Sequence, residues 1–132
     1  MEDYYEKIKR FINNMGLEIV SEDRENVMFV VNNYANGILN LIIQCQHPIL
    51  ILEQHIMSIP EKNKEFIFLR LLQMNRSLIH GAFVVDEKAS NIIFRDTLQI
   101  ENLDLNEFEG SIRSLIMGLI EFGDELISLK KN

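Results

Sequence analysis

Apolar residues recur every three or four positions in three segments of the chain, and this spacing predicts three amphipathic helices. The first helix is expected over residues 3–15 and ends before Gly16, because glycine commonly follows the last turn of a helix. The second is expected over about Glu61–Asn75, and the third is expected to begin at about Leu105. The chain therefore has a helix at each end and one in the middle.

Short polar signals mark where the second and third helices are expected to begin. Ser58 and Glu61 have the spacing of a capping box, and Pro60 lies where a first-turn proline is favoured. Asp104 and Glu107 have the same spacing ahead of the last helix. Both pairs predict that a side chain satisfies the unpaired amides of the first helical turn.

Five short apolar stretches between these helices predict strands: Val27–Asn32, Gly37–Gln44, Ile49–Ile56, Ala82–Val85 and Asn91–Arg95. Leu17–Val20 begins extended, and the polar run Ser21–Asn26 predicts a turn. The expected order is α-β-β-β-α-β-β-α. Because the strands come in runs, the predicted fold class is α+β, with a mostly antiparallel sheet packed against helices. The length of 132 residues predicts a single domain over residues 1–132.

Charge and composition narrow the classes of partner. The formal net charge is −7, and the chain has no basic stripe of the kind that displaces counterions from nucleic acid. Neither nucleic acid nor an anionic membrane is therefore an expected partner. The single cysteine, Cys45, excludes an internal disulfide. The sequence has no signal-peptide pattern and no apolar run of about 18 residues, so a cytoplasmic location is expected.

No sequence motif points to catalysis or to a bound cofactor. Cys45, His47 and His55 are close in sequence, but their spacing matches no established zinc pattern. Ser128 and Lys131 have a Ser-x-x-Lys spacing, yet they lie at the C-terminus without the partner motifs of an acyl-transfer enzyme. We therefore expect a protein that is not an enzyme and that has no cofactor and no metal site. An enzyme whose catalytic residues form no motif is the alternative.

The last helix has the most regular pattern in the chain. Its apolar residues follow one another at alternating steps of three and four: Leu105, Phe108, Ile112, Leu115, Leu119, Phe122 and Leu126. A stripe of this kind usually faces the core of its own domain, and we favour that interpretation. Contact with a second copy or with a client segment is the alternative.

The middle helix is apolar over more than one face. Its broad apolar arc contains Ile67, Phe68, Leu71, Leu72, Met74, Leu78 and Ile79, and Phe66 and Leu69 lie outside this arc. Such a helix is either enclosed in a core or contacts another chain, and the sequence leaves both possibilities open. Asn75, within the arc, is expected to bond main-chain groups at the end of its own helix and in the following loop rather than to bind a ligand.

Apolar residues beyond those that the core-facing side of a strand or helix needs predict where a partner binds. The predicted protein-binding surface consists of Val27, Phe29 and Val31 on the first strand, with Phe66 and Leu69 on the middle helix. The predicted partner is a client protein or a peptide segment. A small-molecule sensor, with its pocket between the sheet and the helices, is the alternative from another functional class.

Five short sequence segments in the second half of the chain form a recognisable pattern: Leu71–Asn75, Gly81–Asp86, Ile92–Arg95, Leu98–Ile100 and Leu103–Phe108. They resemble the type III secretion chaperone-like fold. That group includes the class I secretion chaperones of the Tir-chaperone kind and the YbjN-like family. In these families a helix ends in a Leu-Leu-x-x-Asn pattern, a glycine leads into two strands, and a Leu-Asp pair opens the last helix. The resemblance is sharpest over residues 66–122, and the element order matches over the whole chain.

The resemblance carries expectations about function. Similarity to the chaperones implies a homodimer that holds a partly unfolded client segment along apolar surface patches. Similarity to the YbjN-like family implies a regulatory or chaperone-like role. An extended client can add to an exposed strand and place its side chains in apolar pockets, which makes the chaperone role physically plausible.

Overall fold

The computed structural model describes residues 3–131 and confirms the α+β class. Its helices and strands are, in order, α1 (Tyr4–Asn14), β1 (Glu18–Asp23), β2 (Met28–Asn33), the short 3-10 turn η1 (Tyr34–Asn36), β3 (Ile38–Gln46), β4 (Ile49–Ser58), α2 (Lys64–Asn75), β5 (Ala82–Val85), β6 (Asn91–Gln99) and α3 (Leu105–Lys131). No helix among the described residues is long and apolar enough to cross a membrane.

Within residues 3–131 the strands form one six-stranded sheet in the order β1-β2-β3-β4-β6-β5. Every neighbouring pair is antiparallel, as the sequence predicted. The chain leaves the sheet after β4, passes through α2, and returns as the β5–β6 hairpin, with β6 beside β4. Ile49 pairs with Gln99 at one end of the β4–β6 ladder, and Ser58 pairs with Asn91 at the other.

Strand β1 was not counted by the sequence prediction, which placed a turn over Ser21–Asn26. In the structure β1 pairs with β2, and the turn begins only after Asp23. The reason is that β1 is an edge strand whose side chains are mostly polar and exposed, so it carries no apolar alternation. Its main-chain pairing with β2 holds it in the sheet instead.

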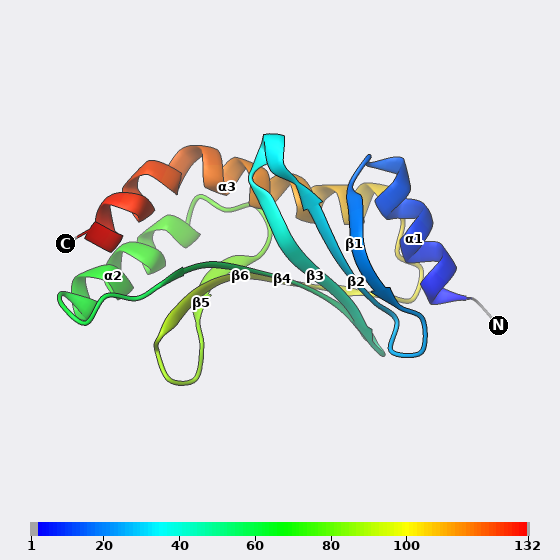
Figure 1. Cartoon of the computed structure of the whole chain (residues 1–132), viewed down its shortest axis with the longest axis horizontal. Coiled ribbons are helices and arrows are strands. Elements are labelled where there is room, and N and C mark those ends of the chain that lie inside the picture. The colour runs from blue at the N-terminus through cyan, green and yellow to red at the C-terminus, as the bar shows by residue number, and fades with distance from the viewer. Residues whose placement is uncertain (1–2, 132) are drawn as a thin grey trace.

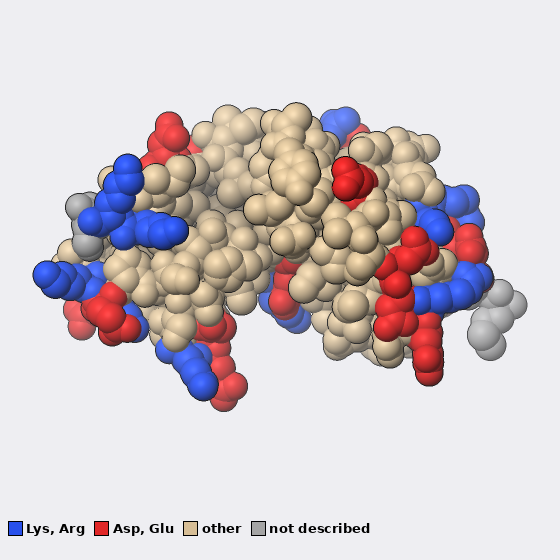
Figure 2. All heavy atoms as spheres, in the orientation of Figure 1, with Lys and Arg blue, Asp and Glu red and all other residues tan. Residues whose placement is uncertain are grey.

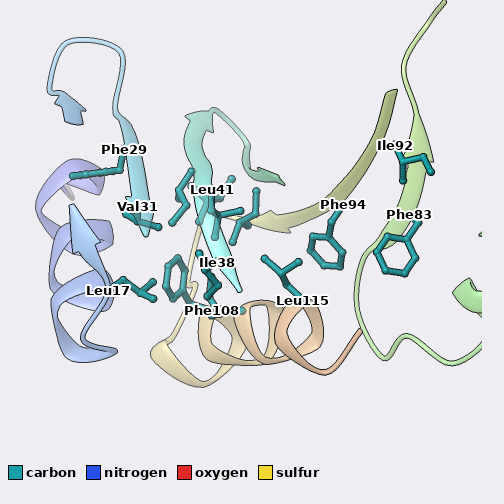
Figure 3. Packing of buried hydrophobic residues seen from close by; sticks show 14 of the residues in the cluster. Leu17, Phe29, Val31, Ile38, Leu41, Phe83, Ile92, Phe94, Phe108 and Leu115 are labelled. Carbon is teal, nitrogen blue, oxygen red and sulfur yellow. The ribbon is translucent and has the colours of Figure 1, made fainter. Parts of the chain in front are cut away.

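The core lies between the arched sheet and the helices. Helix α3 runs along the long axis of the molecule over the sheet, with α1 near one end and α2 near the other (Figure 1). Side chains from the strands, including Ile38, Leu41 and Phe94, point toward Phe108 and Leu115 of α3 (Figure 3). All five are buried. One continuous apolar cluster therefore links the sheet to α3.

The favoured interpretation of the last helix is confirmed. Within its regular stripe the structure buries Phe108, Ile112, Leu115, Phe122 and Leu126 in the core. The rings of Phe108 and Phe11 lie 5.6 Å apart between centroids, which joins α3 to α1. The stripe faces the core because buried apolar side chains of the sheet pack against it.

The predicted capping box ahead of α3 is present. The Glu107 amide donates to Asp104 Oδ1 at 2.8 Å, and the Asp104 amide donates to Glu107 Oε1 at 3.3 Å.

The predicted start of α2 is wrong. Ser58 ends β4, where it pairs with β6, and α2 begins only at Lys64. Strand pairing with β6 thus replaces the predicted N-cap role of Ser58, and Asn63, in the left-handed region, precedes the helix.

Asn75 has a structural role, as predicted, but its bonding partner is different. Its side-chain Nδ2 donates to the Phe83 carbonyl oxygen at 3.1 Å, and its Oδ1 accepts from the Phe83 amide at 2.8 Å. Phe83 lies in β5, the edge strand next to α2. The amide of Asn75 therefore occupies main-chain groups that a neighbouring strand would otherwise use.

Replacing Asn75 with alanine is expected to lower the free energy of unfolding by about 1–3 kcal/mol, because the Phe83 amide and carbonyl lose their partner next to the core. Urea denaturation followed by circular dichroism measures the change. Gln73→Ala is the matched control, because Gln73 lies on the exposed side of the same helix. Equal losses in the two variants would contradict a structural role for Asn75.

Candidate partner-binding surface

Three exposed apolar side chains form a row along α2. Phe66, Leu69 and Leu72 follow at intervals of three residues, and they are 54%, 51% and 68% exposed. Residues three apart are neighbours on a helix surface, so these side chains form one continuous strip. We call Phe66, Leu69 and Leu72 the α2 row. Phe66 and Leu69 thus lie on the surface, where a partner can reach them.

Helix α2 has this row although another of its faces is already buried. Ile67, Leu71 and Met74 pack into the core. That burial is sufficient to attach the helix, so the fold does not require apolar residues on the side facing solvent. The sequence left two possibilities open for this helix, enclosure in a core or contact with another chain. The structure does not enclose α2 on all sides. Contiguous apolar surface of this kind commonly marks an interaction site.

A groove of about 320 Å³ borders the row, between α2 and the edge strand β5. Its lining residues are Phe68, Leu71, Leu72, Asn75, Phe83, Val84 and Val85. Leu72 belongs both to the row and to the groove, so the two form one apolar surface. Because Asn75 already bonds the Phe83 main chain, the groove offers side-chain contacts rather than strand addition at Phe83.

An ion pair fixes α2 against α3 beside this surface. Arg70 Nε lies 2.5 Å from Glu125 Oε2, and Arg70 Nη2 donates to Glu125 Oε1 at 2.7 Å. The hydrogen bonds from Arg70 lower the pKa of the Glu125 carboxyl and raise the pKa of Arg70. The two-bond geometry adds a directional contact between α2 and α3 beside the α2 row.

The pair is expected to make stability depend on pH in the acid range. The pKa of Glu125 is lower in the folded protein than in the unfolded chain, so the stabilisation is present at neutral pH and disappears as pH falls through the folded pKa. Glu125→Gln should therefore cost up to about 1 kcal/mol at neutral pH, because both side chains are partly exposed, and nothing in strong acid. Chemical unfolding across the acid range measures this, with Glu121→Gln as the control. A cost independent of pH would contradict the assignment.

The strand residues of the predicted binding surface are buried or partly buried. Phe29 and Val31 are 0% exposed, and the ring of Tyr5 stacks on Phe29 with centroids 4.9 Å apart. Val27 is partly buried and packs against the same cluster. The prediction that Phe29 and Val31 meet a partner is therefore wrong for the folded chain. Helix α1 covers this face of β2, which the apolar pattern of the strand alone could not reveal.

The face of the sheet opposite the core is also apolar, and it was not part of the binding surface predicted from the sequence. Val30, Ile42, Ile51 and Ile93 are not among the core residues, and Ile42 is 40% exposed. Val30 pairs directly with Ile42 across β2 and β3, which makes an apolar strip on this face. The sequence did contain a signal for this face. These strands have apolar residues at successive positions, and since successive side chains of a strand point to opposite faces, one set of them must point away from the core.

On the face of the molecule drawn in Figure 2, Lys, Arg, Asp and Glu gather at the two ends and along the lower edge, whereas the middle is largely uncharged. The residues considered for zinc do not form a site: His55 Nε2 lies 2.9 Å from Asn91 Oδ1, and His47 lies beside the Tyr4 ring. Nowhere in residues 3–131 do three His, Cys, Asp or Glu side chains converge as metal ligands would.

Comparison with solved structures shows where this fold occurs. The chain is similar to YbjN from E. coli, a candidate transcription regulator, with a TM-score of 0.68, 11% identity and 92% of each chain covered. It is also similar to the Yersinia pestis type III secretion chaperone SycH, solved in complex with a stable fragment of YscM2, with a TM-score of 0.58, 13% identity, and 89% of this chain and 98% of that chain covered.

A third similar structure is the complex of the chaperone SchA with the effector HopA1, with a TM-score of 0.55, 15% identity, and 87% of this chain and 91% of that chain covered. No curated protein matches the sequence as a relative. The CesT_Tir_1 family model matches residues 1–132. The resemblance inferred from the sequence is therefore confirmed, and the chain belongs to the CesT_Tir_1 family and has the fold of the type III secretion chaperones.

Proposed function

We propose that this protein is a non-enzymatic, cytoplasmic, chaperone-like protein that binds an apolar segment of a client protein and acts as a homodimer. The observation that carries the client-binding proposal is the α2 row with its adjoining groove, an apolar surface that the fold leaves exposed. Family membership supports it, as do two structural neighbours that were solved with a protein fragment or an effector.

The size of the surface sets the length of segment that fits. Phe66 and Leu72 are six residues apart, which is about 9 Å along a helix, and the groove extends this surface to β5. An extended chain rises about 3.3 Å per residue, so the α2 row contacts about three or four residues of a client. Large apolar side chains in the client would fill the groove, and their burial supplies the binding energy.

The test compares two leucine variants of the tagged full-length chain. Leu69→Asn removes the centre of the α2 row, and Leu39→Asn is the matched control because Leu39 is also about half exposed (49%) and lies on β3. Each variant is used to capture partners from lysate of the native cells, followed by mass spectrometry. We expect one dominant, near-stoichiometric protein with the wild type and with Leu39→Asn. With Leu69→Asn we expect affinity for that protein to fall about five- to thirtyfold, since a central contact is commonly worth about 1–2 kcal/mol.

Folding and binding are separated by circular dichroism on each purified variant. Because Leu69 is half exposed, its replacement should leave the spectrum and the melting temperature near those of the wild type. Equal capture by Leu69→Asn and the wild type would remove the α2 row from the binding site. No captured protein with the wild type would argue against the chaperone role itself.

A further inference from the structure

A pocket of about 300 Å³ lies between α3 and the strands β3 and β4. One wall is a side of α3 that carries Leu119, Gly123, Ile127 and Lys130, and the opposite wall includes Leu39 of β3. Leu39 and Ile127 are 49% and 56% exposed, so each wall has an apolar side chain that still faces solvent. The pocket shares no residue with the α2 row or with the groove beside it.

The pocket is preformed, because hydrogen bonds fix the turn that closes one of its ends. Gln54 is only 4% exposed; its Nε2 donates to the Gly37 carbonyl oxygen at 3.0 Å, and its Oε1 accepts from the Leu39 amide at 3.1 Å. A Cβ added to Gly37 would lie 3.2 Å from Leu119 Cδ1, so the turn packs directly against α3. A pocket held in this way loses little conformational freedom when a ligand binds.

Gly123 lies in the interior of α3, and no neighbouring side chain requires a glycine there. Apart from the backbone of its own helix, no atom of residues 3–131 lies within 4 Å of the position of an added Cβ. Gly118 differs, since a Cβ there would lie 2.8 Å from Leu78 Cδ2. Glycine inside a helix lowers stability relative to alanine. Gly123 therefore keeps open a space that the fold itself does not fill, and this space belongs to the pocket.

The pocket is elongated along α3. Leu119 lies at the end that the Gly37 turn closes, and Lys130 is eleven residues further on, which is about 16 Å along the helix axis. Gly123 lies between them on the same side of the helix. Further apolar residues that line the pocket are Ile56, Met57 and Leu126. Such a trough suits an unbranched alkyl chain, because each methylene that it buries adds to the binding energy.

The charges at the pocket favour an acid at the end of such a chain. Lys130 lines the pocket, whereas no Asp or Glu does, in a chain whose net charge is −7. Among residues 3–131, Lys130 takes part in no ion pair. The C-terminal end of α3 carries a partial charge of about −0.5, which Lys130 and Lys131 together outweigh. An ammonium beside an apolar trough is complementary to a carboxylate on an alkyl chain.

We propose that this pocket binds a medium-chain fatty acid, with the alkyl chain over Gly123 and the carboxylate at Lys130. The methyl end lies at the Gly37 turn, where the pocket is closed. The inference goes beyond the client-binding role proposed above and does not depend on it. Each buried methylene should strengthen binding by up to about fourfold.

An NMR titration of the isotope-labelled full-length chain with decanoate, below the concentration at which micelles form, tests the site. We expect saturable shifts of the amide signals of residues 37–39, 54–57 and 119–130, with a dissociation constant of about 1 mM or lower. Octanoate lacks two methylenes and should bind roughly tenfold more weakly. Decan-1-ol has the same chain without the charge, and it should bind about two- to fivefold more weakly than decanoate.

Two variants test the two ends of the assignment. Gly123→Leu should weaken decanoate binding at least about tenfold, because the leucine side chain fills the trough. Lys130→Gln should weaken it about two- to fivefold, the range for an exposed ion pair, and should leave decan-1-ol binding unchanged. Lys131→Gln is the matched control, because Lys131 does not line the pocket.

Gly123→Ala separates the pocket from the fold. Alanine is the better helix former and meets no atom here, so the melting temperature should rise by about 2–5 °C. The added methyl group narrows the trough, so decanoate binding should weaken in the same variant. A lower melting temperature would overturn the inference that Gly123 is kept open for a ligand.

The outcomes separate this site from the client-binding surface. Leu39→Asn should weaken decanoate binding and keep the client, whereas Leu69→Asn should lose the client and keep decanoate. Saturable binding that Gly123→Leu and Lys130→Gln weaken supports the site. Signal shifts confined to α2 and lost in Leu69→Asn would place the acid on the α2 row and overturn the site. No saturable binding by the wild type would overturn it too, whether or not the protein captures a client.

Discussion

Replacing Phe108 with alanine is expected to lower the free energy of unfolding by about 3–5 kcal/mol, the usual cost of truncating a fully buried phenylalanine. Phe108 is 0% exposed, and its ring contacts Phe11 where α1, α3 and the sheet meet. Stabilities of domains this size are about 5–15 kcal/mol, so the change removes a large part of the total. Urea denaturation monitored by circular dichroism measures the difference.

The matched control for this variant is Phe66→Ala, the same change at a side chain that is 54% exposed. A half-exposed position leaves no closed cavity, so the expected loss is within about 1 kcal/mol. Similar losses in the two variants would show that Phe108 does not lie at the centre of the core. A dimeric wild type requires that both variants be compared at one protein concentration, because association adds to apparent stability.

Gly81→Ala should also destabilise the protein strongly, by about 3 kcal/mol, for two separate reasons. Gly81 has φ +71, in the left-handed region that alanine enters at a cost. An added Cβ would lie 2.6 Å from Phe94 Cζ and 2.9 Å from the Arg95 main-chain oxygen. The ring can shift only by disturbing the core, and the main-chain oxygen belongs to β6. Thermal and urea unfolding report the combined cost.

Gly16→Ala separates the two reasons. Gly16 has φ +70, nearly the same as Gly81, but no atom lies within 4 Å of the position of an added Cβ. The expected loss is therefore the conformational part alone, about 1 kcal/mol. If Gly81→Ala cost no more than Gly16→Ala, the close approach of Gly81 to Phe94 and β6 would be refuted.

The sequence by itself determined the class of fold and most of its elements. Helical periodicity located α1 and α3, and the run of apolar stretches indicated an antiparallel sheet, because these patterns record which face each segment buries. The Asp104–Glu107 box located the start of α3 because the capping bonds join residues three apart. The likeness to the secretion-chaperone fold was visible for the same reason, because each sequence segment that carries it is a short continuous stretch of the chain.

What the sequence missed depends on contacts between distant segments. The polar strand β1 is held by main-chain bonds to β2, so its side chains carried no signal. Ser58 has the chemistry of an N-cap, yet pairing with Asn91 of β6 keeps it in a strand. In both places, hydrogen bonds to another element outweighed a local preference.

Only the tertiary structure decided which apolar residues remain available to a partner. Phe29 and Phe66 were equal candidates by sequence, but α1 covers Phe29, whereas nothing among the described residues encloses Phe66. The same holds for α3, whose regular stripe packs against the sheet, whereas Ile120 on another side of the helix stays exposed. Periodicity shows how many apolar faces a helix has. Which of them is covered depends on elements brought together from elsewhere in the chain, and so it cannot be obtained from the segment alone.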